Sequence, residues 1–141
     1  MANLEKAIIF ATRKHSGQID KAGQPYILHP LRLMTKMRTD EQRIVAVLHD
    51  ILEDTDATVV DLISLGFSQD IISAVEALTR RDGESRIEAA WRAVKNPLAR
   101  EVKLADVSDN LDINRISHPT ERDFKRLKEY QQVQQILQQN A

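Results

Sequence analysis

A run of five apolar residues with no polar face is the feature that most constrains the fold of this chain. Residues 44–48 read Ile-Val-Ala-Val-Leu, and they lie within a helical pattern over residues 41–54 that Asp40 can cap. A helix that is apolar on every side is stable only where other elements surround it. The sequence therefore predicts a central, buried helix around which the rest of the chain packs.

Helical patterns cover most of the remaining sequence. Only residues 99–107 are ambiguous between strand and helix, and we interpret them as buried helix. Residues 16–25 contain two glycines and a proline, which predict a loop. Helices are expected over residues 3–15, 41–54, 58–65, 68–81, 84–95, 97–112 and 120–139, and one more is expected to begin at Pro30. The fold class we predict is all-α, a compact single-domain helical bundle spanning residues 1–141.

Composition excludes several classes of function. The sequence has no cysteine, which removes disulfides, thiolate zinc sites and cysteine nucleophiles together. Its net charge of −1 gives no indication of general binding to nucleic acid or to membrane surfaces. No apolar run approaches the roughly 20 residues of a spanning helix, and the N-terminus lacks the pattern of a signal peptide. We therefore expect a cytoplasmic protein, monomeric or homodimeric, whose partner is a small molecule.

Four polar side chains follow the apolar run directly. His49 faces Glu53 one helical turn away, and Asp50 faces both Glu53 and Asp54. Three carboxylates thus crowd the C-terminal end of the predicted helix, where the helix dipole is already negative. Burying uncompensated carboxylates is costly, so this end of the helix is expected to hold a cation. A solvated helix end is the alternative, and the apolar run immediately upstream argues against it.

Two distant segments supply further candidates for metal binding. His29 lies between apolar residues and Pro30, which is expected to leave it extended at the mouth of a helix. Asp106 lies within another apolar run. Taken singly, His29 could cap a helix and Asp106 could be a buried hydrogen-bond acceptor. With His49 and Asp50 they form a set of two imidazoles and two carboxylates, which suits manganese, iron or zinc better than calcium.

The four candidate ligands lie within a larger set of motifs. These motifs are His15-Ser16-Gly17-Gln18, Pro25-Tyr26-Ile27-Leu28-His29-Pro30, His49-Asp50-Ile51-Leu52-Glu53-Asp54-Thr55 and Lys103-Leu104-Ala105-Asp106, followed by Asn110. With these motifs the chain resembles the HD-domain superfamily over nearly its whole length, and within it the hydrolase domain of the RelA/SpoT homologues. In size it is most similar to the stand-alone small alarmone hydrolases. The block His-Asp-x-x-Glu-Asp-Thr is much more specific to this group than His-Asp alone.

The resemblance implies an enzyme and gives roles to particular residues. It implies one bound divalent metal ion, manganese, with the ligands His29, His49, Asp50 and Asp106. It makes Glu53 and Asp54 a catalytic pair, one helical turn from the ligands, that orients a water molecule and takes its proton. It implies nucleotide contacts from Lys21, Asn110, Arg126 and Tyr130. The implied reaction is removal of pyrophosphate from the 3′ position of ppGpp or pppGpp, which yields GDP or GTP.

Two positions depart from the family pattern and keep alternatives open. Asp20 stands two residues after Gln18, where the family usually has arginine, and Val107 stands where lysine or arginine usually follows the metal aspartate. Both changes remove positive charge beside an anionic ligand. A second hypothesis is therefore hydrolysis of another nucleotide, such as a nucleoside phosphate or NADPH. A third is a non-catalytic regulator that binds a nucleotide, and the presence of both Glu53 and Asp54 beside a complete ligand set argues against it.

Overall fold

Polar capping residues mark the starts of most helices in the computed structural model, which describes residues 2–140. They are Asn3, Thr39, Thr58, Ser68, Ser85, Asn96 and Thr120. In each case the side-chain oxygen accepts a hydrogen bond from a backbone amide in the first turn, which contributes about 1 kcal/mol. Four of these caps form capping boxes, in which the side chain three residues later accepts a hydrogen bond from the backbone amide of the capping residue. They are the caps at Thr39, Thr58, Ser85 and Thr120.

The prediction of an all-α fold is confirmed. Within residues 2–140 the structure contains α-helices, one short 3-10 helix and a single isolated β-bridge between Ile19 and Pro25. The helices are α1 (Leu4–Lys14), α2 (Leu28–Thr35), α3 (Asp40–Leu48), α4 (Ile51–Asp54), α5 (Val59–Ser64), α6 (Gln69–Leu78), α7 (Arg86–Val94), α8 (Pro97–Asn110), the 3-10 helix η1 (Ile113–Arg115) and α9 (Glu121–Gln139). No helix in this part of the chain has the length and apolar character needed to cross a membrane.

The apolar run at residues 44–48 forms the buried helix that the sequence predicts. These residues of α3 are at most 5% exposed, and α3 packs against α1, α2, α6 and α8. They belong to the larger of two hydrophobic clusters, which also includes Leu33, Leu62 and Ile72. Full burial of an aliphatic side chain of this size contributes about 1.5–3 kcal/mol. Helix α3 is therefore a rigid support for the polar residues that follow it.

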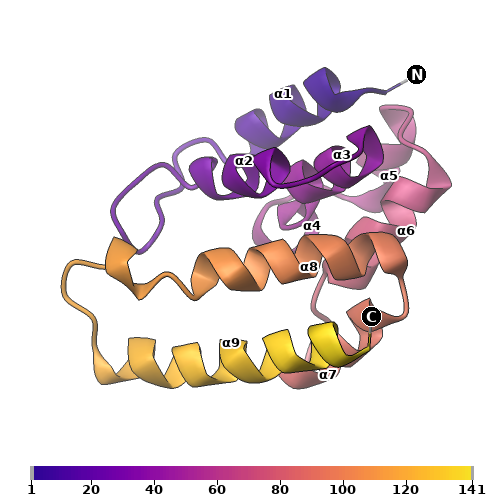
Figure 1. Ribbon diagram of the computed structural model, residues 1–141. Helices are drawn as coiled ribbons and strands as arrows, with labels where there is room; N and C mark the ends of the chain where they lie inside the picture. The colour runs from indigo at the N-terminus through magenta and orange to yellow at the C-terminus, as the bar shows by residue number, and fades with distance from the viewer. Residues whose placement is uncertain (1, 141) are drawn as a thin grey trace.

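Helix α8 carries apolar residues for both clusters. Val102 and Ala105 belong to the larger cluster, whereas Val107 joins Ala90 of α7 and Val133 of α9 in the smaller one. Figure 1 shows α8 running between the layer formed by α1, α2 and α3 and the antiparallel helix α9. Polar residues on α8 are consequently placed between the two clusters.

The helix predicted over residues 41–54 is interrupted, and the prediction of one continuous helix is wrong. The turn at His49 and Asp50 separates α3 from α4. The Nδ1–H of His49 donates to the carbonyl oxygen of Ala46 (2.7 Å), the group that a continuing helix would pair with the amide of Asp50. A side chain thus takes the place of a backbone donor where the helix breaks.

The interruption also changes the position of two acidic residues. Glu53 and Asp54 lie in the first turn of α4 and not at the C-terminal end of a longer helix. The dipole of a long helix therefore does not oppose the negative charge of Glu53 and Asp54. The prediction that this dipole adds to the need for a cation is wrong.

His29 differs from the prediction as well. The sequence predicts an extended His29 before a helix that starts at Pro30, but His29 lies in the first turn of α2 and is buried. Its amide bonds to the carbonyl oxygen of Tyr26 (3.0 Å), so helical turns begin upstream of Pro30. The imidazole is therefore carried by a helix and not by a loop.

Candidate metal centre

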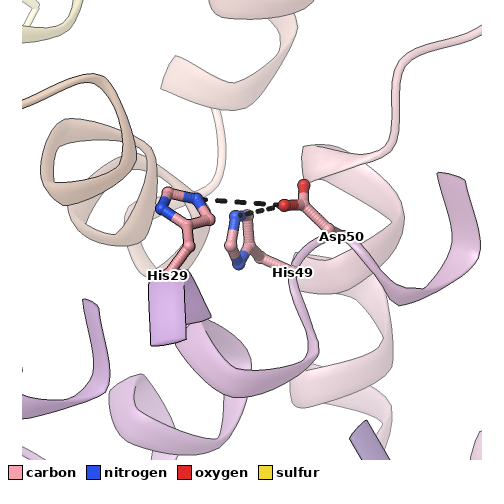
Figure 2. A group of neighbouring side chains, drawn as sticks. All are labelled: His29, His49 and Asp50. Atoms are coloured by element: carbon pink, nitrogen blue, oxygen red, sulfur yellow. Dashed lines mark ion pairs between the residues drawn. The ribbon is translucent and has the colours of Figure 1, made fainter. Parts of the chain in front are cut away.

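At one place in the fold, side chains from three parts of the chain approach one another: His29 on α2, His49 and Asp50 at the α3–α4 turn, and Asp106 on α8. Nε2 of His49 lies 3.0 Å from Oδ2 of Asp50 and 3.6 Å from Oδ1 of Asp106. Nε2 of His29 lies 3.0 Å from Oδ1 of Asp106 and 3.9 Å from Oδ2 of Asp50. Figure 2 shows both imidazoles beside the carboxylate of Asp50. One donor atom each of His29, His49 and Asp50 lies within 4.8 Å of the other two, and Oδ1 of Asp106 lies beside both imidazoles.

The ring of His49 is oriented to bind a cation. Its Nδ1–H donates to the carbonyl oxygen of Ala46, so the neutral ring carries its lone pair on Nε2. This buried Nε2 has no hydrogen-bond partner within residues 2–140. It faces the carboxylate oxygens of Asp50 and Asp106, which cannot donate a hydrogen bond when ionised. Lone pairs that face one another in this way fit a divalent metal with mixed nitrogen and oxygen ligands.

The charges of this cluster are strongly interdependent. Burial opposes protonation of His49, but Asp50 and Asp106 outweigh burial and raise the pKa of the ring. Burial likewise opposes ionisation of Asp106, but Lys103 and the two imidazoles lower the pKa of its carboxyl. The carboxylates thus favour positive charge at this place, and a bound metal ion, whose ligands are neutral imidazoles and ionised carboxylates, would supply it.

Three polar side chains hold the two carboxylates of the cluster. The hydroxyl of Tyr26 donates to Oδ2 of Asp50, and burial together with Asp50 raises the pKa of this phenol, so it stays a donor. Nζ of Lys103 donates to Oδ2 of Asp106 (2.9 Å). Nδ2 of Asn110 donates to Oδ1 of the same carboxylate (3.1 Å). Such contacts limit how far metal-binding carboxylates can rotate.

The acidic residues of α4 lie beside the cluster. Glu53 lines the adjoining cavity, and its Oε1 accepts a hydrogen bond from the amide of Arg80 (2.7 Å). Asp54 lies outside the lining residues of that cavity. Partial burial and the charges of Asp50 and Glu53 raise the pKa of the Asp54 carboxyl to about 6. A carboxyl that titrates near neutral pH is suited to accept and return a proton.

A cavity of about 400 Å³ adjoins the cluster. His29, Asp50 and Asp106 form part of its wall, and its volume is in the range of pockets for small organic ligands. The four residues predicted to contact a nucleotide all line it: Lys21, Asn110, Arg126 and Tyr130. The structure therefore brings three of the four predicted metal ligands and all four predicted substrate contacts together around one cavity.

Four basic residues to which the sequence analysis gave no role also line the cavity: Arg80, Arg86, Lys103 and Arg115. Lys103 carries a local signal, because it stands three residues before Asp106 on one helix. Arg86 carries none, since its Cζ reaches to 5.3 Å from the ring centre of Tyr130 only through the packing of α7 against α9. The wall also includes the acidic residues Asp20, Asp112 and Asp123.

Comparison with known proteins gives similarities to one group. Residues 7–109 match the family model described as HD domain. A guanosine-3′,5′-bis(diphosphate) 3′-pyrophosphohydrolase of Aquifex aeolicus is 32% identical over 120 residues, which cover 77% of this chain and 17% of that protein. A GTP pyrophosphokinase of Myxococcus xanthus is 36% identical over 81 residues, which cover 55% of this chain and 11% of that protein. The chain thus spans less than a fifth of the length of these two relatives.

A solved structure is similar over almost the whole chain. It is the structure of a metazoan orthologue of SpoT that is described as hydrolysing ppGpp. The two structures superpose with a TM-score of 0.77 at 26% sequence identity, covering 99% of this chain and 85% of the other.

Proposed function

The chain belongs to the HD domain family, and from that premise we propose that it is a metal-dependent phosphohydrolase acting on ppGpp or pppGpp. The reaction removes the 3′-pyrophosphate and leaves GDP or GTP. Two similarities support this substrate. The Aquifex aeolicus relative is named as a 3′-pyrophosphohydrolase, and the metazoan protein of similar structure is described as hydrolysing ppGpp.

We assign the metal to four ligands, His29, His49, Asp50 and Asp106, with one manganese ion as the proposed cofactor. The unpartnered Nε2 of His49 supports the assignment, since it faces two carboxylates in a buried site. Imidazole and carboxylate donors together suit manganese. When bound, the ion lowers the pKa of a coordinated water and stabilises charge on the phosphoryl oxygens.

The chain's own residues handle the proton and position the phosphorus. A water oxygen bonds to the phosphorus attached to the 3′ oxygen, and the bond between that phosphorus and the 3′ oxygen breaks. The pair of Glu53 and Asp54 takes one proton from the water, and one proton is delivered to the leaving 3′ oxygen, which becomes the 3′ hydroxyl of the nucleotide. Glu53 is held for this task by the amide of Arg80, which leaves its second carboxylate oxygen for the water.

The cavity wall supplies the contacts that hold an anionic nucleotide. Lys103 lies beside the metal cluster, where the transferred phosphates would sit. Lys21 and Arg126 provide further cations on the wall, and Asn110 faces the same space. The ring of Tyr130, with the guanidinium of Arg86 against it, offers a flat surface for a base or ribose.

One observation carries the proposal: three of the four candidate ligands, His29, Asp50 and Asp106, line the cavity that also collects the predicted nucleotide contacts. The fourth, His49, lies directly behind them, with Nε2 3.0 Å from Oδ2 of Asp50. A release assay tests it. Purified protein with manganese is given ppGpp, pppGpp, NADPH and a nucleoside monophosphate in turn, and both pyrophosphate and orthophosphate are measured. His49→Ala, which removes a ligand, is the control for contaminating phosphatases.

We expect pyrophosphate from ppGpp and pppGpp, and none from His49→Ala. Orthophosphate from NADPH or the monophosphate, without pyrophosphate from ppGpp, would transfer the activity to another nucleotide. Saturable ppGpp binding with no product of either kind would make the protein a non-catalytic regulator.

A further inference from the structure

Asp109 is a buried carboxylate next to the metal cluster but outside the cavity lining. It lies on α8 one turn after Asp106, and it is 6% exposed. Oδ2 of Asp109 is 2.6 Å from Nδ1 of His29. An acidic side chain that is almost fully buried needs partners for both oxygens, and the geometry shows where they come from.

A guanidinium holds Asp109 in one orientation. Nε of Arg32 donates to Oδ1 (2.9 Å) and Nη2 donates to Oδ2 (3.0 Å), which is a two-point contact. Contacts of this kind fix the plane of a carboxylate as well as its position. Because Arg32 follows His29 by three residues on α2, one helix carries both the imidazole and the group that orients its partner.

A second guanidinium connects Asp109 to the cavity wall. Nη2 of Arg115, on η1, donates to the backbone oxygen of Asp109 (2.6 Å) and lies 3.5 Å from Oδ2. Arg115 also lines the cavity. The carboxylate is thus held from α2 on one side and from the segment after α8 on the other.

The arrangement determines which nitrogen of His29 carries the proton. A carboxylate paired with two arginines accepts hydrogen bonds and does not donate them, so the short contact to Nδ1 requires a proton on Nδ1. The lone pair of His29 is then on Nε2, the atom that faces Asp106 and Asp50. Hydrogen bonds of this type commonly set the tautomer and ring orientation of metal-binding histidines.

We infer that Asp109 is a positioning residue of the metal site, which fixes the Nδ1–H tautomer of His29 and directs Nε2 to the ion, while Arg32 and Arg115 hold Asp109 in place. The inference rests on the ligand set of the proposed function. It adds a residue that touches neither the metal nor the substrate, and it gives Arg32 and Arg115 a shared task.

Manganese affinity in the absence of nucleotide is the first measurement, made by following the electron paramagnetic resonance signal of free Mn²⁺. Asp109→Ala removes the acceptor, and we expect about 10- to 100-fold weaker binding, the range seen when outer contacts of metal ligands are lost. Asp109→Asn keeps an acceptor oxygen in nearly the same shape, so we expect a smaller, several-fold loss. Glu101→Gln is the matched control: it removes a carboxylate charge from the same helix, where Glu101 pairs with Arg100 and lies outside the cavity lining. We expect affinity within about twofold of the wild type for this variant.

A nuclear magnetic resonance signature separates positioning from general stability. In protein loaded with diamagnetic Zn²⁺, the Nδ1–H of His29 should give a strongly downfield proton resonance. The Nδ1–H of His49, bonded to the carbonyl oxygen of Ala46, serves as an internal reference. Asp109→Asn should shift the His29 resonance and leave the His49 resonance in place.

Unchanged manganese affinity in folded Asp109→Asn and Asp109→Ala would overturn the inference, and so would an unchanged His29 resonance in Asp109→Asn. If Asp109→Ala does not fold, the nearly isosteric asparagine variant decides alone. Absence of manganese binding by the wild type would remove the metal site of the proposed function, and this inference with it. Tight manganese binding without pyrophosphate release would contradict only the proposed reaction and leave the role of Asp109 intact.

Discussion

The carboxylate of Asp20 forms hydrogen bonds within its own loop. Oδ1 accepts hydrogen bonds from the amides of Ala22 and Gln24, both at 2.9 Å, and the backbone amide of Asp20 donates to the carbonyl oxygen of Gln24 (2.8 Å). Aspartate and asparagine favour such turns because their side chains can bond to amides a few residues ahead. Asp20 therefore stabilises the turn before α2 in addition to placing a negative charge on the cavity wall.

Asp20→Asn separates these two effects. Asparagine keeps the acceptor oxygen and the turn but removes the charge that repels an anionic nucleotide. We expect KM for ppGpp to fall several-fold at low salt, corresponding to on the order of 1 kcal/mol, with kcat nearly unchanged, because the charge acts equally on the ground and transition states. The gain should shrink as salt is raised. Equal KM values at low ionic strength would mean that the charge does not reach the ligand.

Glu53 and Asp54 are testable as a proton-handling pair. Glu53→Gln keeps an oxygen for the amide of Arg80, and both Glu53→Gln and Asp54→Asn leave the proposed ligands intact. We expect each variant to bind manganese normally and to lose about 100-fold or more in kcat. Asp56→Asn is the control, since this nearby exposed carboxylate pairs with Lys14 away from the cavity. Normal turnover in Glu53→Gln and Asp54→Asn would reduce them to surface carboxylates.

Among the elements, the connection between α6 and α7 depends on one arginine. Arg92 on α7 forms two hydrogen bonds to the carboxylate of Glu84 (2.9 and 2.8 Å). The same guanidinium donates to the carbonyl oxygens of Ala77 (3.3 Å) and Thr79 (2.7 Å) at the end of α6. Carbonyl groups at the last turn of a helix have no partner within that helix, so Arg92 completes α6 from the neighbouring element.

Arg92→Ala should be strongly destabilising. It leaves Glu84 and several carbonyl groups without a donor, and we expect a loss of about 3 kcal/mol in the free energy of unfolding. Arg92→Lys should recover only part of this, because an ammonium group cannot reproduce the planar fork. Urea unfolding measures both. Lys14→Ala, which removes a single ion pair at the surface, is the comparison and should cost much less than Arg92→Ala. Equal losses in the two alanine variants would contradict this role of Arg92.

The same contact predicts a pH dependence. The hydrogen bonds from Arg92 lower the pKa of Glu84 from 4.5 to about 2. A carboxyl whose folded-state pKa is depressed contributes stability above its unfolded pKa, and this contribution is lost as pH falls through the folded value. The difference in unfolding free energy between the wild type and Glu84→Gln should therefore be full above about pH 5 and shrink toward pH 2. A difference that stays constant over this range would show that the charge of Glu84 is not its source.

Across the whole molecule, the proposed metal site joins parts of the chain that are far apart in the sequence. α2, the α3–α4 turn and α8 all contribute ligands, and α8 belongs to both hydrophobic clusters. An ion bound only by the native state stabilises it in proportion to its concentration relative to its dissociation constant.

Metal removal should consequently lower the melting temperature. At a manganese concentration 100-fold above its dissociation constant, the expected stabilisation is about 2.7 kcal/mol, and a chelator should abolish it. Returning manganese should restore the original melting temperature. His49→Ala should melt at the same temperature with and without manganese; an equal metal-dependent rise in this variant would place the ion elsewhere.

The sequence predicts much of this architecture, and its errors have local causes. Helical spacing places the helices, because that signal acts within one or two turns. The predicted cap of α3 is wrong by one residue: Thr39 caps the helix, and Asp40 is its first residue. The pattern of apolar residues does not predict the break at His49, because the break depends on the contact of the His49 side chain with the carbonyl oxygen of Ala46. The candidate ligands stand out as polar residues in apolar runs, whereas Arg86 and Arg115 reach the cavity through packing and chain reversal that local patterns do not encode. The sequence shows that Asp109 follows Asp106 by three residues, so both are expected on one face of a helix. It does not show that Asp109 contacts His29.

The ligands of the proposed site also impose an order on folding. Asp106 follows Asp50 by more than a third of the chain, so both histidines have been synthesised long before α8 exists. Closing segments of that length costs entropy that native packing repays, and we therefore expect the proposed ion to bind to a nearly finished fold and not to nucleate one. Until an ion binds, Asp106 needs a counter-charge from its own neighbourhood. Lys103, paired with it across a single turn of α8, is available as soon as that helix forms.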